Sequence, residues 1–188
     1  MSVDSRQTSS HGERVAIVDE EPLHDHVDQS FEFVATLNRR RVRARTPYST
    51  SLAELLRLRF GLTGTKVSCD EEICGACTVL LDREPVSSCT FLAYDARGRN
   101  VTTIEGVAEE SGELHPVQQA FLEQFAFQCG FCTPGMVLSA VALLEKQPEA
   151  SREQIVDHMD GNICRCTGYA SILAAVEQAR DELNRPRT

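Results

Sequence analysis

Three cysteines in one short loop constrain this chain more than any other feature of its sequence. They are Cys69, Cys74 and Cys77, in the spacing C-x4-C-x2-C, and Cys89 follows twelve residues after the third. This is the ligand spacing of a plant-type 2Fe-2S cluster, in which one loop supplies three thiolates and a neighbouring strand supplies the fourth. The small residues before Cys77 let backbone amides approach the cluster's sulfurs. Structural cysteine or a zinc site is the alternative, but zinc ligands usually come as two close pairs.

Four further cysteines form two short motifs in the second half of the chain, a C-x2-C and a C-x-C: Cys129, Cys132, Cys164 and Cys166. Each motif alone is weak evidence, because redox dithiols and zinc knuckles share such spacings. Together, in a chain that already carries a ferredoxin-type loop, they predict a second cluster held by two turns that meet. The alternative is four disulfides, which a reducing compartment and a chain of this size disfavour.

Charge and hydropathy exclude several classes of partner. The net charge of -9 argues against nucleic acid, which is bound through clustered Lys and Arg. The longest apolar stretch, residues 136–144, is far shorter than the roughly 20 residues that span a bilayer. The amino terminus has no apolar segment typical of a secretory signal, so we expect a cytoplasmic protein.

Residues 1–30 are polar and acidic, and we expect a disordered leader. The three histidines of this segment, His11, His24 and His26, suggest a metal site as an alternative. Scattered histidines in such a tail are more often inert.

Residues 31–107 are expected to form a small mixed sheet crossed by one helix, the arrangement called a β-grasp. Apolar residues alternate from Phe31 to Leu37 as in a half-buried strand, and Asn38-Arg39 turns the chain into a second strand. A capping box at residues 51–54 opens a helix that Gly61 ends. Further strands are expected at residues 78–81, 86–89 and 101–104, the first two joined through Asp82-Arg83.

Five arginines lie between Arg39 and Arg45. A nucleic-acid patch is one interpretation, and docking onto an acidic partner is another. A solvated strand face is favoured, because three of the arginines alternate with apolar residues and charged strands also block edge pairing.

Residues 108–188 are expected to form a four-helix bundle, which makes the whole chain α+β. The acidic, glycine-containing residues 108–115 suit a linker. A helix is expected at residues 116–126, and a second starts at Thr133-Pro134, where threonine caps and proline occupies the first turn. Two more are expected at residues 151–161 and 170–180, so that both cysteine motifs fall in turns between helices.

At four strings of residues the chain resembles the iron-sulfur subunit of the molybdenum hydroxylases, which include xanthine dehydrogenase, aldehyde oxidoreductase, carbon monoxide dehydrogenase and N-heterocycle dehydrogenases. The strings are CGACT at 74–78, TTIEG at 102–106, QCGFCTPG at 128–135 and NICRCTGY at 162–169. They span both expected domains in the expected order, which makes the match far more specific than any single motif.

The resemblance implies an electron-transfer subunit with no substrate chemistry of its own. A molybdopterin site in a large partner subunit would oxidise the substrate, and electrons would pass through the bundle cluster and the β-grasp cluster to FAD in a medium-sized third subunit. It implies that Gln128 hydrogen-bonds the pterin cofactor and that Cys166 leads electrons in. The complex would be a heterotrimer, paired as a dimer of heterotrimers. No residue of this chain would touch the substrate, so the sequence does not name it.

One residue departs from the family pattern, which usually has glycine where Glu72 stands. If the backbone is left-handed there, a side chain costs about 1 to 2 kcal/mol. The family's hairpin turns also often carry glycine where Arg39 and Arg83 stand, so the geometry of these loops is open.

Two other classes of function compete with this interpretation. One is a free-standing two-cluster electron carrier, and the other is a zinc-stapled interaction module. The second domain favours a subunit over a carrier, because a simple ferredoxin needs only the β-grasp.

Overall fold

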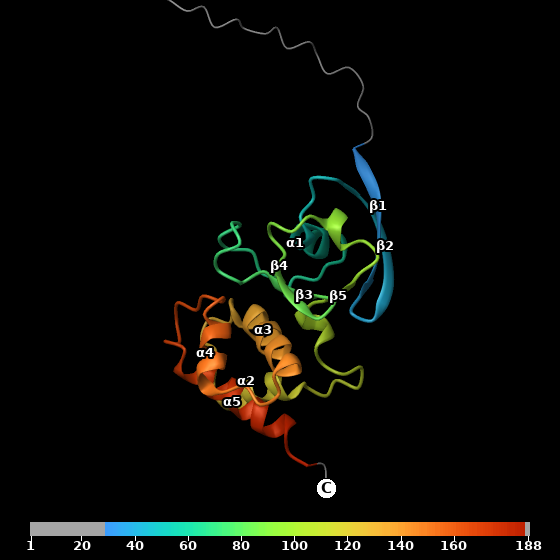
Figure 1. The fold of residues 1–188 in the computed structure, drawn as a ribbon. Helices are drawn as coiled ribbons and strands as arrows, with labels where there is room; N and C mark the ends of the chain where they lie inside the picture. Colours follow the sequence, from blue (N-terminus) through green and yellow to red (C-terminus); the bar gives the residue numbers. More distant parts are fainter. Residues whose placement is uncertain (1–28, 187–188) are drawn as a thin grey trace, which may run out of the picture.

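The computed structural model describes residues 29–186, which form an α+β fold with one five-stranded sheet and a helical part (Figure 1). The expected leader therefore lies outside the described residues except for its last two positions, and so do His11, His24 and His26. Among residues 29–186, no helix is long and apolar enough to cross a bilayer.

The sheet has the strand order β2-β1-β5-β3-β4. β1 is parallel to β5 and antiparallel to β2, whereas β3 is antiparallel to both β4 and β5. The sheet is therefore mixed, as expected. The strands are β1 (Ser30–Leu37), β2 (Arg40–Pro47), β3 (Thr78–Leu81), β4 (Glu84–Ser87) and β5 (Asn100–Thr102).

Both expected hairpin turns are present, and both are built from left-handed residues. Asn38 and Arg39 have φ of 47° and 68°, and Asp82 and Arg83 have φ of 51° and 72°. Positive φ at both central residues is the type I′ geometry, whose twist matches that of the flanking strands. Arg39 and Arg83 thus adopt a left-handed conformation in which glycine is more usual than a residue with a side chain.

Two expected strands have different bounds in the structure. β4 begins at Glu84 rather than at residue 86 and ends before Cys89, because a two-residue turn pairs the chain with β3 at once. β5 begins and ends earlier than expected, and Ile104 lies in a 3-10 turn instead. Cys89 consequently lies in a turn beyond β4 rather than in the strand.

The helix over the sheet begins with the expected capping box. In α1 (Leu52–Glu54) the Ser51 side chain accepts the Glu54 N–H, and the Glu54 side chain accepts the Ser51 N–H. The next residues, Leu55–Arg59, form a π-helical turn that the periodicity did not predict, and Gly61 follows with φ of 69°. The apolar face of this segment is fully buried against the sheet.

The second half of the chain is helical, as expected. Its helices are α2 (Pro116–Glu123), α3 (Thr133–Lys146), α4 (Arg152–Met159) and α5 (Ala170–Leu183). Ser151 caps α4 with a capping box, as expected.

The expectation that Thr133 caps α3 is wrong. The chain is already helical at Cys132, with φ of -81° and ψ of -15°, so Cys132 occupies the cap position and makes no side-chain capping bond. Thr133 lies inside the first turn, and its buried hydroxyl has no partner in the described part of the chain.

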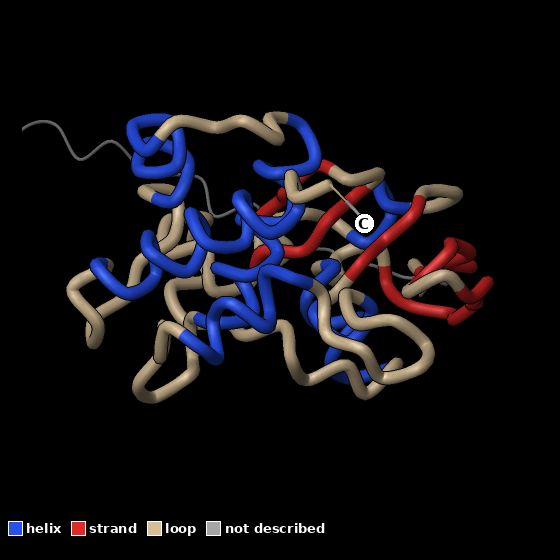
Figure 2. The backbone as a smooth tube through the Cα atoms, turned by 90° about the horizontal axis from the view of Figure 1, so that it is seen from below, coloured by secondary structure: helices blue, strands red, loops and turns tan. Residues whose placement is uncertain are grey.

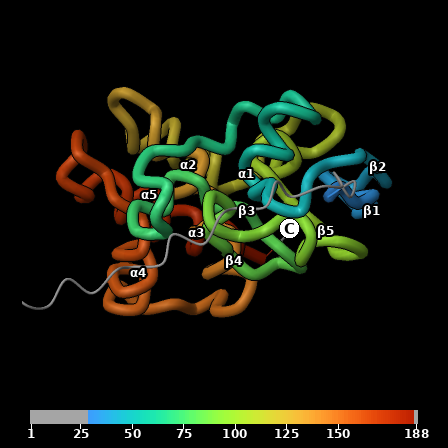
Figure 3. The backbone as a smooth tube through the Cα atoms, turned by 90° about the horizontal axis from the view of Figure 1, so that it is seen from above, coloured from blue at the N-terminus to red at the C-terminus, as the bar shows by residue number. Residues whose placement is uncertain are grey.

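Two hydrophobic cores lie on opposite faces of the sheet. Val79 and Leu81 of β3 belong to the core beneath α1, whereas Leu80 points the other way and belongs to the core of the helical part. β3 is accordingly buried on both faces, and α3 packs against it. The ion pair between Arg83 and Glu145, at 2.9 Å, also joins the sheet to α3. Figure 2 shows the strands running from the middle of the molecule to one end, and Figure 3 shows β1, β2 and β5 at one end, α4 and α5 at the other, and β3 between them.

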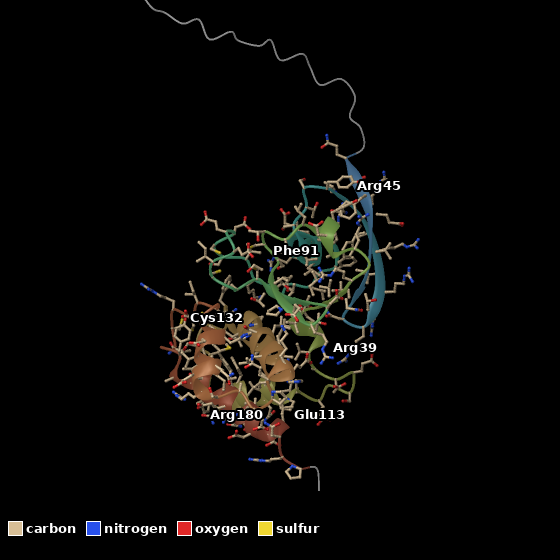
Figure 4. The ribbon with its side chains drawn as sticks, in the orientation of Figure 1. Arg39, Arg45, Phe91, Glu113, Cys132 and Arg180 are labelled. Carbon is tan, nitrogen blue, oxygen red and sulfur yellow. The ribbon has the colours of Figure 1, made fainter. Side chains whose placement is uncertain are left out.

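The arginines of β2 lie at the edge of the sheet, where Figure 4 labels Arg45. Arg41, Arg43 and Arg45 are exposed, as expected for a solvated face, and Arg43 pairs with Glu32 at 3.8 Å.

Candidate functional site: two groups of cysteines

The first group of cysteines is held by a loop that coils through three left-handed residues. Asp70, Glu72 and Gly75 have φ of 58°, 62° and 66°. The left-handed backbone considered for Glu72 is therefore present. Its carboxylate accepts a hydrogen bond from the Thr90 hydroxyl at 3.1 Å, which ties the loop to the segment after β4.

The coiled loop aims backbone N–H groups at one sulfur. The amides of Glu71, Ile73 and Cys74 donate to Cys69 Sγ at 3.5, 3.4 and 3.4 Å. These hydrogen bonds, that of Glu71 first, lower the pKa of Cys69 to about 7. The thiolate is the form of cysteine that ligates metals, so these hydrogen bonds favour the form of Cys69 that can bind a metal.

Two other cysteines of the first group, Cys77 and Cys89, are buried. Cys77 immediately precedes β3, and Ser88, the residue before Cys89, donates both its N–H and its hydroxyl to the Cys77 carbonyl. Burial raises the pKa of Cys77 to about 11. Ligation at this position therefore has to release a proton, as metal binding to cysteine generally does.

The second group lies where two interhelical turns meet. The turn before α3 carries Cys129 and Cys132, and the turn before α5 carries Cys164 and Cys166. All four line one cavity of about 240 Å³, and the sulfurs of Cys129 and Cys166 are 3.6 Å apart. The expected meeting of the two turns is thus present.

Burial and hydrogen bonding differ among these four thiols. Burial, with Cys164 beside it, raises the pKa of Cys132 to about 12. Burial also opposes ionisation of Cys164, but hydrogen bonds with Thr167, Cys166 and Cys132 together outweigh it and lower the pKa of this thiol. The Thr167 hydroxyl lies 3.2 Å from Cys164 Sγ. Cys129 and Cys166 are exposed, so this group reaches the surface of the protein.

All eight cysteines are free thiols in the structure. In residues 29–186, no three His, Cys, Asp or Glu side chains are arranged to hold a single metal ion. The thiols of the second group instead surround a shared space, and a donor set of four thiols fits a 2Fe-2S cluster.

The two groups of cysteines are neighbours. Cys74 and Ala76 of the first loop line the same cavity as the second group, and the Ile163 N–H donates to the Cys74 carbonyl at 2.9 Å. Figure 4 places Cys132 at the boundary between the sheet and the helical part. Cys74 of the first group is therefore hydrogen-bonded to the residue that precedes Cys164 of the second group.

Gln128 is exposed beside Cys129, in the segment between α2 and α3. The structure places it at the surface that the exposed cysteines reach.

Two residues at this site were not singled out from the sequence. Asn162 is buried with 4% of its surface exposed, and Tyr169 has a left-handed backbone with φ of 67°. The Tyr169 hydroxyl accepts the Cys164 N–H at 2.8 Å and donates to the Asn162 carbonyl at 3.1 Å. Both residues stand at the ends of the string NICRCTGY, but these hydrogen bonds join residues five and seven positions apart in an irregular turn, and no spacing rule reveals them.

Two family models match the chain, one over each half. One is described as a 2Fe-2S iron-sulfur cluster binding domain and matches residues 35–113. The other is described as a 2Fe-2S binding domain and matches residues 103–177.

Curated relatives match most of the described chain. A probable xanthine dehydrogenase subunit from Bacillus subtilis is 48% identical over 136 residues, which is 72% of this chain and 78% of the relative. The nicotinate dehydrogenase small FeS subunit of Eubacterium barkeri is 52% identical over 128 residues, which is 68% of this chain and 81% of the relative.

Solved structures show the same fold. A chain of quinoline 2-oxidoreductase from Pseudomonas putida 86 superposes with a TM-score of 0.78 at 39% identity, covering 82% of this chain and 95% of that one. The aldehyde oxidoreductase of Desulfovibrio desulfuricans superposes with a TM-score of 0.77 at 39% identity, covering 81% of this chain and 17% of that one.

Proposed function

Because the chain belongs to the family of 2Fe-2S iron-sulfur subunits of the molybdenum hydroxylases, we propose that its two groups of cysteines hold its two clusters. Cys69, Cys74, Cys77 and Cys89 would ligate the first. Cys129, Cys132, Cys164 and Cys166 would ligate the second. The chain is the electron-transfer subunit of a multi-subunit oxidoreductase, and a 2Fe-2S cluster supplies the one-electron steps that this role needs.

One observation supports the direction of electron flow. The second group reaches the surface through Cys129 and Cys166, and Cys74 of the first group lines the same cavity, so the first group is the next stop for an electron that enters there. We infer that electrons enter from a molybdopterin site in a large partner subunit at Cys166 and leave from the first group toward FAD in a medium-sized subunit. The exposed Gln128 would donate a hydrogen bond to the pterin.

The finer architecture and assembly are part of the same proposal. We assign residues 31–107 to a β-grasp domain and residues 108–188 to a four-helix bundle, supported by the strand order and by the shared core of α2 to α5. We propose a heterotrimer that pairs into a dimer of heterotrimers. A cytoplasmic location is proposed because the cysteines are free thiols.

Metal analysis of anaerobically purified protein tests the ligand assignment. We expect about four iron and four inorganic sulfide per chain, since each 2Fe-2S cluster contains two of each. Cys132→Ser should remove one cluster's paramagnetic signal and leave the other. Zinc in place of iron, or loss of both signals from this one substitution, would contradict the assignment.

Co-purification tests the role as a subunit. The tagged chain should bring down a large molybdenum subunit and an FAD subunit from its native host. A chain that purifies alone with both clusters, and exchanges electrons with soluble carriers, would favour the free-standing carrier.

A further inference from the structure

Asn162 is the buried polar residue that joins the two cysteine-bearing loops. It follows α4 and precedes Cys164 by two residues. Its side-chain Nδ2 donates to the carbonyl of Gly75 at 2.8 Å and lies 3.3 Å from Thr78 Oγ1. Gly75 stands between Cys74 and Cys77, so the side chain of a residue in the second loop binds the backbone of the first.

The contact leaves no room for a side chain on either of two neighbouring glycines. A Cβ on Gly75 would lie 2.5 Å from Asn162 Nδ2 and 2.6 Å from the Gly161 carbonyl. A Cβ on Gly135, in the first turn of α3, would lie 2.3 Å from the Gly75 carbonyl oxygen. Both cysteine-bearing turns of the helical part therefore pack directly against the first loop.

The backbone of Asn162 is tied as firmly as its side chain. Its carbonyl accepts the Tyr169 hydroxyl, which in turn accepts the Cys164 N–H. The next residue, Ile163, donates its N–H to the Cys74 carbonyl at 2.9 Å. One short segment is thus anchored to a ligand residue on each side.

We propose that Asn162 is a positioning residue that fixes the separation of the two clusters and thereby sets how fast an electron passes between them. This inference rests on the proposed function. Electron tunnelling weakens steeply with distance and is poorer across a gap than along hydrogen bonds. A buried donor that fixes the position of a neighbouring loop is the kind of supporting contact that keeps a site from loosening. Loss of the Asn162 amide would leave the Gly75 carbonyl with a weaker set of donors and loosen the Ile163 to Cys74 hydrogen bond beside it.

Asn162→Asp is the most direct test, because the side chain keeps its size but loses both amide protons. The new carboxylate would face the carbonyl oxygen of Gly75 and repel it. Asn184→Ala is the matched control, since the Asn184 side chain also donates to a backbone carbonyl, that of Pro148 at 2.7 Å, in the same helical part.

Two measurements on the purified complex separate positioning from a general structural role. The first is the magnetic interaction between the two clusters when both are reduced, seen as splitting of their paramagnetic resonance signals. The second is the rate at which an electron equilibrates between them after rapid reduction. Asn162→Asp should keep four iron per chain, diminish the splitting and slow the equilibration several-fold, while Asn184→Ala matches wild type.

The possible failures are distinguishable. Wild-type protein without iron would defeat the proposed function itself. Wild-type splitting and equilibration rate in an iron-replete Asn162→Asp variant would overturn only the present inference. If this variant loses iron, Tyr169→Phe decides instead, because it removes only the hydroxyl that ties the Asn162 carbonyl to Cys164. Tyr169→Phe should reduce the splitting more weakly, and an unchanged splitting in that variant would overturn the inference.

Discussion

Gly135→Ala sets two opposing effects against each other at the contact between the loops. Gly135 is buried in the first turn of α3, where alanine normally stabilises a helix by about 1 kcal/mol relative to glycine. In this position the added Cβ would lie 2.3 Å from the Gly75 carbonyl oxygen and 3.2 Å from Asn162 Nδ2. Whether the free energy of unfolding rises or falls depends on which is larger, the gain in helix propensity or the steric clash.

The steric effect should be the larger, because the atom that is struck belongs to the backbone. The Gly75 carbonyl also accepts the Thr78 N–H at 3.1 Å and the Thr78 hydroxyl at 2.7 Å, so it has little freedom to turn away. Overpacking costs about 1 to 3 kcal/mol, and we expect the upper part of that range here. Weakening one of these hydrogen bonds adds about 1 kcal/mol. After subtraction of the helix gain, the free energy of unfolding should fall by about 2 to 3 kcal/mol.

Urea unfolding of the cluster-loaded protein under anaerobic conditions, followed by circular dichroism, measures this change. With a slope of about 2 kcal/mol per molar urea, the midpoint should fall by about 1 M. Gly161→Ala is the matched control, because its Cβ would meet only the His158 carbonyl at 3.6 Å and the midpoint should stay near that of wild type. A Gly135→Ala midpoint at or above the wild-type value would refute the reasoning, since helix propensity would then have outweighed the clash.

Three further predictions concern charge and hydrogen bonding. Glu72→Gln should raise the reduction potential of the first cluster and leave that of the second almost unchanged, because a negative carboxylate opposes the added electron. Redox titration followed by paramagnetic resonance measures both potentials. Equal potentials in wild type and variant would contradict the prediction. Thr167→Val should lower the reduction potential of the second cluster, because it removes the hydroxyl 3.2 Å from Cys164 Sγ, which stabilises the more negative, reduced cluster. Thr167→Ser keeps a hydroxyl and should leave this potential unchanged. Burial lowers the pKa of His158 below its ordinary 6.5, so the imidazole binds a proton more tightly in the unfolded chain than in the folded one. The contribution of the buried, neutral His158 to stability is therefore complete above about pH 6.5 and is lost as the pH falls below that value. Urea midpoints between pH 5 and 7 should therefore fall less steeply in His158→Gln than in wild type, and parallel curves would exclude this residue as a cause.

The local features of the site were predictable because each depends on a few neighbouring residues. The spacing of Cys69, Cys74 and Cys77 predicted a wrapped loop, and the structure adds that left-handed residues aim its N–H groups at Cys69. The positions of the interhelical turns that carry the second group also followed from Pro134 at the start of α3 and from the capping box of α4. The departure from the family pattern identified Glu72 as a position of open backbone geometry, and the structure shows that it is left-handed.

Other features could not be predicted, because they depend on packing between distant segments. The π-helical turn after Glu54 carries ordinary helical residues, and nothing in their periodicity distinguishes it. Thr133 has the residue type of a cap, but the turn that carries Cys132 begins the helix one residue earlier. The hydrogen bond from Asn162 to Gly75 joins residues 87 positions apart, beyond the reach of any local pattern.

The burial of β3 on both faces has a consequence for chimeric proteins. Leu80 belongs to the helical core although it precedes the linker by nearly thirty residues, and Arg83 and Glu84 pair with Glu145 and Lys146 of α3. The boundary at which two relatives could be recombined therefore does not coincide with the linker along the chain. A helical half taken from another family member would have to bring that member's residues at positions 80, 83 and 84 with it. These residues form part of the interface with the helices, but they lie on β3, in the turn after it and at the start of β4, outside the helical half.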